Sequence, residues 1–236
     1  MIGEEGMARL RAARVLVVGV GGVGSYAAEA IARAGVGTVT VCDGDEVAAS
    51  NLNRQLVALA STIGSNKAIV MAERIKDINP ACQVTAIPQF YGPARQKEGS
   101  ASAEATAFPS GSACAFPVAE PVLTDYDWII DAIDDVDAKI DLICSAKAAG
   151  VNIVSAMGAA GKFETSFKVA DISKTSVCPL AKVVRKRLRD AGVEHLPVVF
   201  SEEKPLPRNG ELGSISYVPG SMGLELAGYV IKEIVK

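Results

Sequence analysis

Cysteines, aromatic side chains and charged residues are all scarce in this sequence. Five cysteines occur in 236 residues, an odd number without any C-x-x-C pair. A disulfide framework and a four-cysteine zinc site are therefore not expected, and cysteine usage favours a reduced, cytoplasmic protein. The net charge of −3 gives no general attraction to nucleic acid, so a surface that binds it must be a local basic patch.

Long hydrophobic runs and a secretory signal are absent as well, so we expect no membrane-spanning segment. Histidine occurs once, as His195, and is expected to be structural or exposed rather than catalytic. Apolar residues, by contrast, are abundant: they make up 49% of the chain, whereas charged residues make up 22%. This composition predicts a sizeable buried core.

Short apolar strands alternate with helical patterns along most of the chain. Runs rich in β-branched residues predict strands at 14–19, 38–42, 83–87, 127–132 and 151–155. Apolar residues at helical spacing predict helices at 25–34, 66–78 and 138–149. This alternation is typical of an α/β, Rossmann-like, doubly wound and mostly parallel sheet with right-handed crossovers.

We expect a single domain over 1–236. The alternation of strands and helices is interrupted in two places. Residues 93–124 are rich in Ala, Ser, Gly and Pro and predict a mobile insertion. A C-terminal extension starts at about residue 160, where alternating residues predict antiparallel strands added to the sheet. The alternating residues are Phe163, Thr165, Phe167 and Val169. A basic helix at 179–189, a strand at 197–200 and a closing helix at 221–234 follow.

A glycine-rich turn joins the first strand to the first helix. It contains G-x-G-x-x-G at Gly19, Gly21 and Gly24, with an additional glycine at Gly22. Glycines allow the backbone to approach a phosphate closely, and the N-terminus of the following helix offers free N–H groups. Asp43 ends the next strand, about twenty residues later, where a carboxylate can accept hydrogen bonds from ribose hydroxyls. These residues indicate a bound nucleotide, but they do not distinguish NAD from ATP.

The segment from Asp43 to Gln55 helps to separate these two ligands. Asn51 and Arg54 are spaced i, i+3 and share a face if the segment is helical, and Lys67 begins the next helix. An arginine and a lysine beyond the ribose carboxylate suit a triphosphate, whose charge must be neutralised. A dinucleotide needs room there for nicotinamide, so a simple NAD dehydrogenase is the weaker hypothesis. Solvated surface cations are the plain alternative.

A run of carboxylates follows the fourth predicted strand in "IIDAIDDVDAK", residues 129–139. Carboxylates at the carboxyl end of a strand suit a hydrated Mg²⁺ that bridges phosphates. Asp134 is the candidate ligand. Asp135 and Asp137 are predicted to be acids at the N-terminus of the following helix.

Together these motifs resemble the ThiF/MoeB/E1-like adenylating enzymes. The similar residues are G-x-G-G-V-G, D-x-D-x-V-x-x-S-N-L-x-R-Q, a downstream lysine and D-x-x-D, within about residues 14–160. The resemblance implies that a carboxylate reacts with MgATP to give an acyl-adenylate and pyrophosphate. It implies that Asp43 binds the ribose, that the phosphates are held by Asn51, Arg54 and Lys67, and that Asp134 binds Mg²⁺. Asp45 and Gln55 complete the expected nucleotide site, and Arg54, Lys67 and Asp134 form the expected catalytic set.

The C-terminal part narrows the resemblance. The segments "VSAMGAAGKFETSFKVADISKTSVCPLAKVVRKRLRDAG", "VVFSEEKP" and "GSISYVPGSMGLELAGYVIKEIV" are similar to the tRNA threonylcarbamoyladenosine dehydratases (TcdA-type). Those enzymes use ATP to activate the threonyl carboxylate of t6A, and ring closure gives cyclic t6A with net loss of water. The resemblance implies tRNA bearing t6A as the substrate and a homodimer as the assembly. It leaves open a monovalent cation and a cysteine desulfurase partner.

The basic helix at 179–189 is a candidate RNA-binding surface if the substrate is tRNA. Its five cations are Lys182, Arg185, Lys186, Arg187 and Arg189. Contact with RNA phosphates and a solvated helix face are equally weighted hypotheses for this run. Cys178, just before the helix, is not expected to act as a covalent catalyst.

Two other functions stay open. One is an adenylyltransferase that activates the C-terminal glycine of a ubiquitin-like sulfur-carrier protein. The other is a non-catalytic adaptor that binds a nucleotide.

Overall fold

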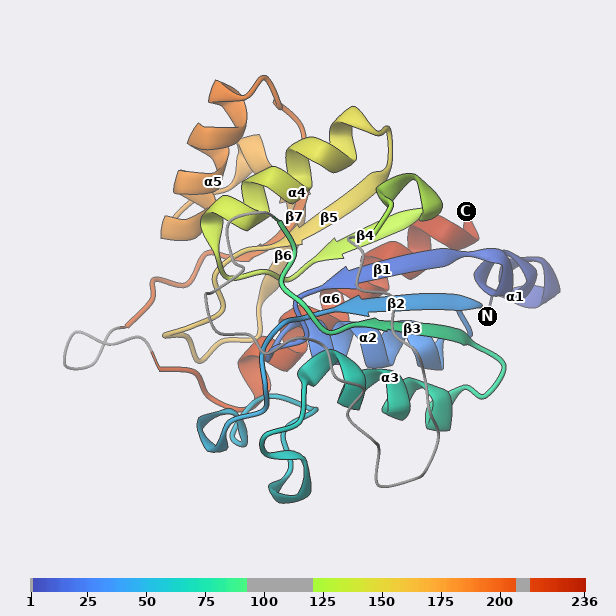
Figure 1. Cartoon of the computed structure of the whole chain (residues 1–236). Coiled ribbons are helices and arrows are strands. Elements are labelled where there is room, and N and C mark those ends of the chain that lie inside the picture. The colour runs from blue at the N-terminus through green and yellow to red at the C-terminus, as the bar shows by residue number, and fades with distance from the viewer. Residues whose placement is uncertain (1, 93–120, 207–212) are drawn as a thin grey trace.

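The fold is built on a seven-stranded sheet (Figure 1), seen in a computed structural model that describes residues 2–92, 121–206 and 213–236. The strand order is β3-β2-β1-β4-β5-β7-β6, and the pairs are parallel except for antiparallel β6 and β7. The strands are β1 (Arg14–Val18), β2 (Thr38–Cys42), β3 (Gln83–Ile87), β4 (Trp128–Asp131), β5 (Asn152–Ala156), β6 (Phe167–Asp171) and β7 (Pro197–Ser201). The predicted fold class is confirmed.

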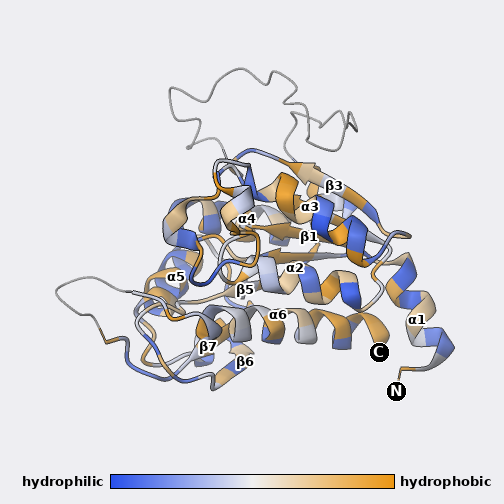
Figure 2. Ribbon diagram, turned by 90° about the horizontal axis from the view of Figure 1, so that it is seen from below, coloured by the Kyte–Doolittle hydropathy of each residue, from blue (hydrophilic) through white to orange (hydrophobic). Residues whose placement is uncertain are grey.

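Helices cover both faces of the sheet (Figure 1). They are α1 (Gly3–Ala12), α2 (Gly24–Arg33), α3 (Lys67–Ile78), α4 (Val136–Ala148), α5 (Pro179–Asp190) and α6 (Tyr217–Val235). Helices α2, α3 and α6 pack on one face, and α4 and α5 pack on the other. Helix α1 lies beside the end of α6, where the two chain termini meet (Figure 2).

The central strands are apolar without interruption because both faces of the sheet are covered. In β1, Val15 and Val17 belong to the core under α2 and α6, whereas Leu16 and Val18 belong to the core under α4 and α5. All four are at most 2% exposed. The alternation of side chains along a strand thus divides one continuous apolar run between two cores.

Helix α6 comes from the C-terminal part of the chain but packs against the start of α2. A Cβ at Gly223 would lie 2.2 Å from the Val23 carbonyl oxygen, and one at Gly220 would lie 3.1 Å from the Tyr26 ring. Only glycine permits so close an approach between the two helices. Helix α6 therefore packs directly against the segment that leads from the glycine-rich turn into α2.

The predicted helices and parallel strands are confirmed to within two residues at each end, except that the closing helix begins at Tyr217, four residues before the predicted start. The alternating stretch after residue 160 is partly wrong as a strand. Strand β6 begins at Phe167, and residues 162–166 are a loop. The Glu203 carboxylate accepts the backbone N–H groups of Phe163 (3.0 Å) and Glu164 (2.9 Å), so a side chain replaces a strand partner there. Phe163 is 48% exposed, so its apolar character does not mark a core face.

Helix α1 was not predicted from the sequence. It has Glu4 and Glu5 in its first turn and Arg9 and Arg11 in its last, the arrangement that the helix dipole favours. Leu10 is fully buried beneath it. The predicted insertion at 93–124 falls outside the described residues except for its last four. No helix in the described ranges is both long and apolar enough to cross a membrane.

Candidate nucleotide-binding site

The glycine-rich turn is wedged between α2 and the end of β4. Gly19 has φ +87°, and a Cβ there would lie 2.6 Å from the Ala132 carbonyl oxygen. A Cβ at Gly24 would lie 1.8 Å from the Gly19 carbonyl oxygen. Gly21 has open space by contrast, its nearest neighbour lying at 3.7 Å. Gly19 and Gly24 therefore shape the turn, while Gly21 leaves room for a ligand to approach the backbone.

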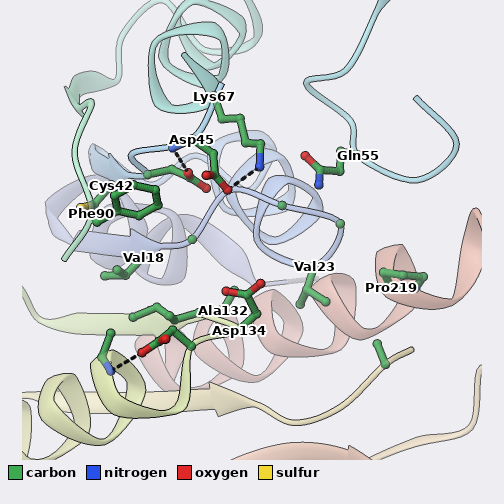
Figure 3. Close-up of a pocket in the computed structure, with 18 of the residues that line it drawn as sticks. Val18, Val23, Cys42, Asp45, Gln55, Lys67, Phe90, Ala132, Asp134 and Pro219 are labelled. Atoms are coloured by element: carbon green, nitrogen blue, oxygen red, sulfur yellow. Dashed lines mark hydrogen bonds and ion pairs between the residues drawn. The ribbon is translucent and has the colours of Figure 1, made fainter. Parts of the chain in front are cut away.

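A cavity of about 370 Å³ opens at the carboxyl ends of β1, β2 and β4, the edge where doubly wound sheets bind ligands. Figure 3 shows Val18, Cys42 and Phe90 at one end, with Asp45 and Lys67 facing Asp134 across the middle. Gln55 and Pro219 lie at the other end. The predicted site residues that line the cavity are Gly19, Gly21, Gly22, Asp43, Asp45, Arg54, Gln55, Lys67 and Asp134.

Asp43 ties the end of β2 to the glycine-rich turn. Its Oδ2 accepts the Val20 N–H at 2.6 Å, and its Oδ1 accepts the Asp45 N–H at 2.8 Å. Burial raises the pKa of the Asp43 carboxyl, and the two backbone hydrogen bonds only partly offset this. The carboxylate is thus held in place by two backbone N–H groups, and each oxygen keeps a lone pair that can accept a further hydrogen bond.

Acidification is therefore expected to weaken nucleotide binding at a higher pH than a solvated aspartate would cause. The raised pKa means that the folded state binds this proton more tightly than the unfolded state. The contribution of Asp43 to stability is thus present below its unfolded pKa and is lost as pH rises through its folded pKa. ATP titrations from neutral pH to about pH 4 test this, with Asp43→Asn as the control that cannot titrate. An equal pH dependence in both proteins would contradict the assignment.

Lys67 presents a nearly buried ammonium to the cavity. It is 6% exposed, and its Nζ lies 2.9 Å from Asp45 Oδ2. Asn66 caps α3 by accepting the Ala68 N–H, and its side-chain amide donates to the Asp43 carbonyl oxygen at 3.1 Å. The start of α3 is thereby fixed to the end of β2, and the lysine with it.

Arg54 and Gln55 reach the cavity, whereas Asn51 does not line it. Arg54 donates to the Ser50 carbonyl oxygen and to Asn53 Oδ1, both at 2.9 Å. Asn51 Oδ1 accepts the Ala48 N–H at 3.0 Å and closes the 3₁₀ turn at Ala49–Asn51. The Arg54 N–H donates to the Asn51 carbonyl oxygen at 3.1 Å, so the two residues do share a turn. The Asn51 side chain nevertheless binds the Ala48 N–H and does not line the cavity. In this structure Asn51 shapes the loop that carries Arg54.

The carboxylates after β4 have separate roles. Asp134 is exposed and points into the cavity (Figure 3). Asp135 caps α4 by accepting the Ala138 N–H at 2.9 Å, as predicted, and Asp137 pairs with Arg187 at 2.6 Å. Within the described ranges, no group of three or more His, Cys, Asp or Glu side chains is arranged so that it could hold a metal ion. A single carboxylate facing a phosphate site fits Mg²⁺, which keeps several waters and binds through one or two carboxylates plus phosphates.

The cations of α5 divide into two groups, and none of them lines the cavity. Arg185 donates to the Thr175 hydroxyl at 2.6 Å and Arg187 pairs with Asp137, so both are engaged within the fold. Lys182, Lys186 and Arg189 are exposed at i, i+4 and i+7, which places them on one face of the helix. Cys178 precedes this helix and is 3% exposed, outside the cavity lining.

Sequence reasoning missed a buried ionic group directly under the Asp134 loop. Lys139 of α4 pairs with Asp131, the last residue of β4, and both side chains are 0% exposed. The available signal was a lysine among the apolar residues of α4, next to Ile140 and four residues before Ile143. A charge on a core-facing helix position needs a buried partner.

These features define an α/β protein in which a glycine-rich turn, a buried carboxylate and two cations surround one cavity at the carboxyl edge of the sheet. The chain belongs to the ThiF family, which matches residues 1–236.

Several proteins with assigned names are similar to this chain over most of its length. The tRNA threonylcarbamoyladenosine dehydratase of Bacillus subtilis is 37% identical over 100% of this chain and 92% of its own length. The protein of that name from Escherichia coli is 39% identical over 82% of this chain and 65% of its own length. The crystal structure of Escherichia coli TcdA in complex with ATP has a TM-score of 0.81 and 32% identity, covering 98% of this chain and 89% of that one.

Proposed function

We propose that this chain is an ATP-dependent tRNA threonylcarbamoyladenosine dehydratase. The observation that carries the proposal is the convergence of Arg54, Lys67 and Asp134 beside the glycine-rich turn. Relatives of the same fold that cover nearly the whole chain bear this name, and one of them binds ATP in its crystal structure.

In the proposed reaction an oxygen of the threonyl carboxylate attacks the α-phosphorus of ATP, and pyrophosphate leaves. A nitrogen or oxygen atom of the neighbouring carbamoyl group then attacks the acyl carbon, loses a proton and displaces AMP. The nucleoside thereby loses the elements of water, which are carried away in AMP and pyrophosphate. The carboxylate is already a nucleophile, so this step needs no histidine base. The side chain of His195 is 81% exposed, which agrees with a role away from the chemistry.

The side chains of this cavity suit that reaction. Backbone N–H groups of the glycine-rich turn and α2 face the phosphates, and Asp43 accepts the ribose hydroxyls. Arg54 and Lys67 offset the charge of the triphosphate. Mg²⁺, held through Asp134, would supply further charge neutralisation on the phosphates. The apolar end with Val18, Cys42 and Phe90 offers a surface for the adenine ring.

The decisive experiment is incubation with ATP, Mg²⁺ and t6A-bearing tRNA, followed by mass spectrometry of the nucleoside and assay of AMP. We expect conversion to cyclic t6A. Unchanged t6A with folded, ATP-binding protein would overturn the proposal. AMP release or pyrophosphate exchange that depends on a ubiquitin-like sulfur carrier, and not on tRNA, would favour the adenylyltransferase alternative. ATP binding without AMP from either substrate would indicate an adaptor.

The exposed face of α5 that carries Lys182, Lys186 and Arg189 is proposed to contact RNA phosphates. Arg185 and Arg187 instead bind Thr175 and Asp137 and so hold the helix on the fold. Replacing Lys182, Lys186 and Arg189 together with glutamate is expected to weaken tRNA binding at least about tenfold. It should also lower the salt dependence by about one unit per lost phosphate contact. Affinity for ATP should not change, because these residues lie outside the cavity. Titrations of tRNA at several salt concentrations measure both quantities.

A charge-matched control separates a local contact from net charge. It replaces three exposed cations away from α5 with glutamate: Arg11, Lys147 and Lys232. Equal loss of tRNA affinity in both triple variants would mean that only overall charge matters.

The remaining partners belong to the same proposal. A homodimer follows from the resemblance described above, and a cytoplasmic location follows from the cysteine usage. The resemblance leaves open a monovalent cation and a cysteine desulfurase partner. Exposed apolar side chains on the segment between β2 and α3, Leu52, Leu59 and Ile63, would give a dimer a contact surface. Sedimentation velocity with and without ATP tests the assembly.

A further inference from the structure

A buried polar cluster lies under the loop that carries Asp134. Asp131 ends β4, Ser155 lies in β5 and Lys139 lies in α4, and each is 0% exposed. Lys139 Nζ donates to Asp131 Oδ2 at 2.8 Å, to Ser155 Oγ at 3.3 Å and to the Ala156 carbonyl oxygen at 3.1 Å. The Ser155 hydroxyl donates to the same Asp131 oxygen at 2.5 Å. Every donor of the ammonium therefore has an acceptor.

The other oxygen of Asp131 acts on the loop itself. Asp131 Oδ1 accepts the Ile133 N–H at 3.1 Å and so sets the turn immediately before Asp134. The neighbouring Ala132 donates its N–H to the Val18 carbonyl oxygen at 2.8 Å. Ala132 also lies against Gly19 so closely that a Cβ there would be 2.6 Å from the Ala132 oxygen. The cluster thus fixes a loop that contacts the glycine-rich turn on one side and carries Asp134 on the other.

Stability alone does not account for this arrangement. Desolvating a lysine and an aspartate costs as much as their attraction returns, and an apolar pair of similar volume often stabilises a fold equally well. The surrounding face of α4 is apolar, with Ile140 and Ile143 in the same core. What an apolar pair cannot supply is an acceptor for the Ile133 N–H.

We propose that Asp131, Lys139 and Ser155 are positioning residues that aim the Asp134 carboxylate at the nucleotide through the hydrogen bond from Ile133 to Asp131. None of the three lines the cavity, so they act through Asp134. Lys139 and Ser155 hold one oxygen of Asp131, which leaves the other oriented toward Ile133. This inference rests on the proposed function for its activity readout.

Two double variants isolate that hydrogen bond. Asp131→Asn with Lys139→Met removes both buried charges but keeps an Oδ1 acceptor for Ile133, and the new amide nitrogen can donate to Ser155 Oγ, so that the side chain stays held without the lysine. Asp131→Leu with Lys139→Met removes the acceptor as well. We expect the first to stay within about threefold of wild-type kcat and the second to lose on the order of 10²-fold, since misplacement by about 1 Å has that effect. The loss should fall on kcat and on the Mg²⁺ concentration for half-maximal rate, with KM for ATP little changed.

Amide hydrogen exchange supplies a readout that does not need activity. The Ile133 N–H should exchange slowly in the wild-type protein and in the asparagine variant, and rapidly in the leucine variant. Equal kcat in the two variants, or equal loss in both, would overturn the inference. If the leucine variant does not fold, rapid exchange of Ile133 in the wild-type protein would overturn it, and slow exchange would support it. An inactive wild-type protein would count against the proposed function, and the exchange result would still decide this inference.

Discussion

Gly24→Ala is expected to reduce ATP affinity by at least about 10²-fold, because the added methyl group would meet backbone rather than a movable side chain. Its Cβ would lie 1.8 Å from the Gly19 carbonyl oxygen and 2.9 Å from the carbonyl carbon. The turn would have to open to admit it, and overpacking of this kind typically destabilises a protein by about 1–3 kcal/mol or more. Opening the turn would move the N–H groups that we propose bind the phosphates. Calorimetric ATP titration and the thermal midpoint measure the two effects.

Two other glycines serve as controls for this result. Gly228 lies within α6 with no atom near its Cβ position, so Gly228→Ala should stabilise the fold by about 0.5–1 kcal/mol and leave ATP affinity unchanged. Gly21→Ala should fold normally, since the nearest atom is the Gln55 amide nitrogen at 3.7 Å. Any loss of ATP affinity at Gly21 would therefore come from the ligand contact itself. Normal ATP binding by Gly24→Ala would show that the turn is not the phosphate site.

Asp134→Ala should lower turnover by on the order of 10²–10³-fold, the usual effect of removing one group that stabilises developing charge. The fold should be unaffected, because Asp135 and not Asp134 caps α4. ATP affinity without Mg²⁺ should stay the same, and the gain on adding Mg²⁺ should be lost. Cyclic t6A formation and ATP titrations with and without Mg²⁺ measure these effects.

Asp137→Ala is the matched control, since Asp137 is an exposed carboxylate three residues away that does not line the cavity. It loses only a surface pair with Arg187, and such pairs contribute about 0–1 kcal/mol. Its turnover should stay within about twofold of wild type. Turnover at the wild-type level in Asp134→Ala would remove Asp134 from the catalytic set.

The sequence was sufficient to predict the sheet because the central strands are buried on both faces. Runs such as Val15–Val18 fit a parallel strand and little else, and Asn66 and Asp135 mark helix starts by their capping chemistry. Elements at the periphery of the fold were harder to predict from the sequence. Helix α1 buries a narrow face around Leu10, and residues 162–166 mimic a strand while Glu203 binds their backbone.

The candidate site was predictable where a residue type has one dominant use, as with Gly19, Asp43 and Lys67. It was less predictable where a side chain has two uses. Asn51 suits a phosphate as well as a turn, and in this structure its oxygen closes the turn at Ala48. The lysine among the apolar residues of α4 indicated a buried partner, but which residues pair with Lys139 depends on how α4 packs on β4 and β5, where Asp131 and Ser155 lie.

The packing of α6 against α2 sets a limit on how this protein can be dissected. A fragment that ends near residue 160 would contain every nucleotide-binding motif, yet it would lack the helix that contacts Val23 and Tyr26 from behind. It would also expose the apolar surface of α2 that α6 covers. Such a fragment contains the motifs but lacks part of the fold. Chimeras between relatives should therefore take α6 and the N-terminal half from the same protein.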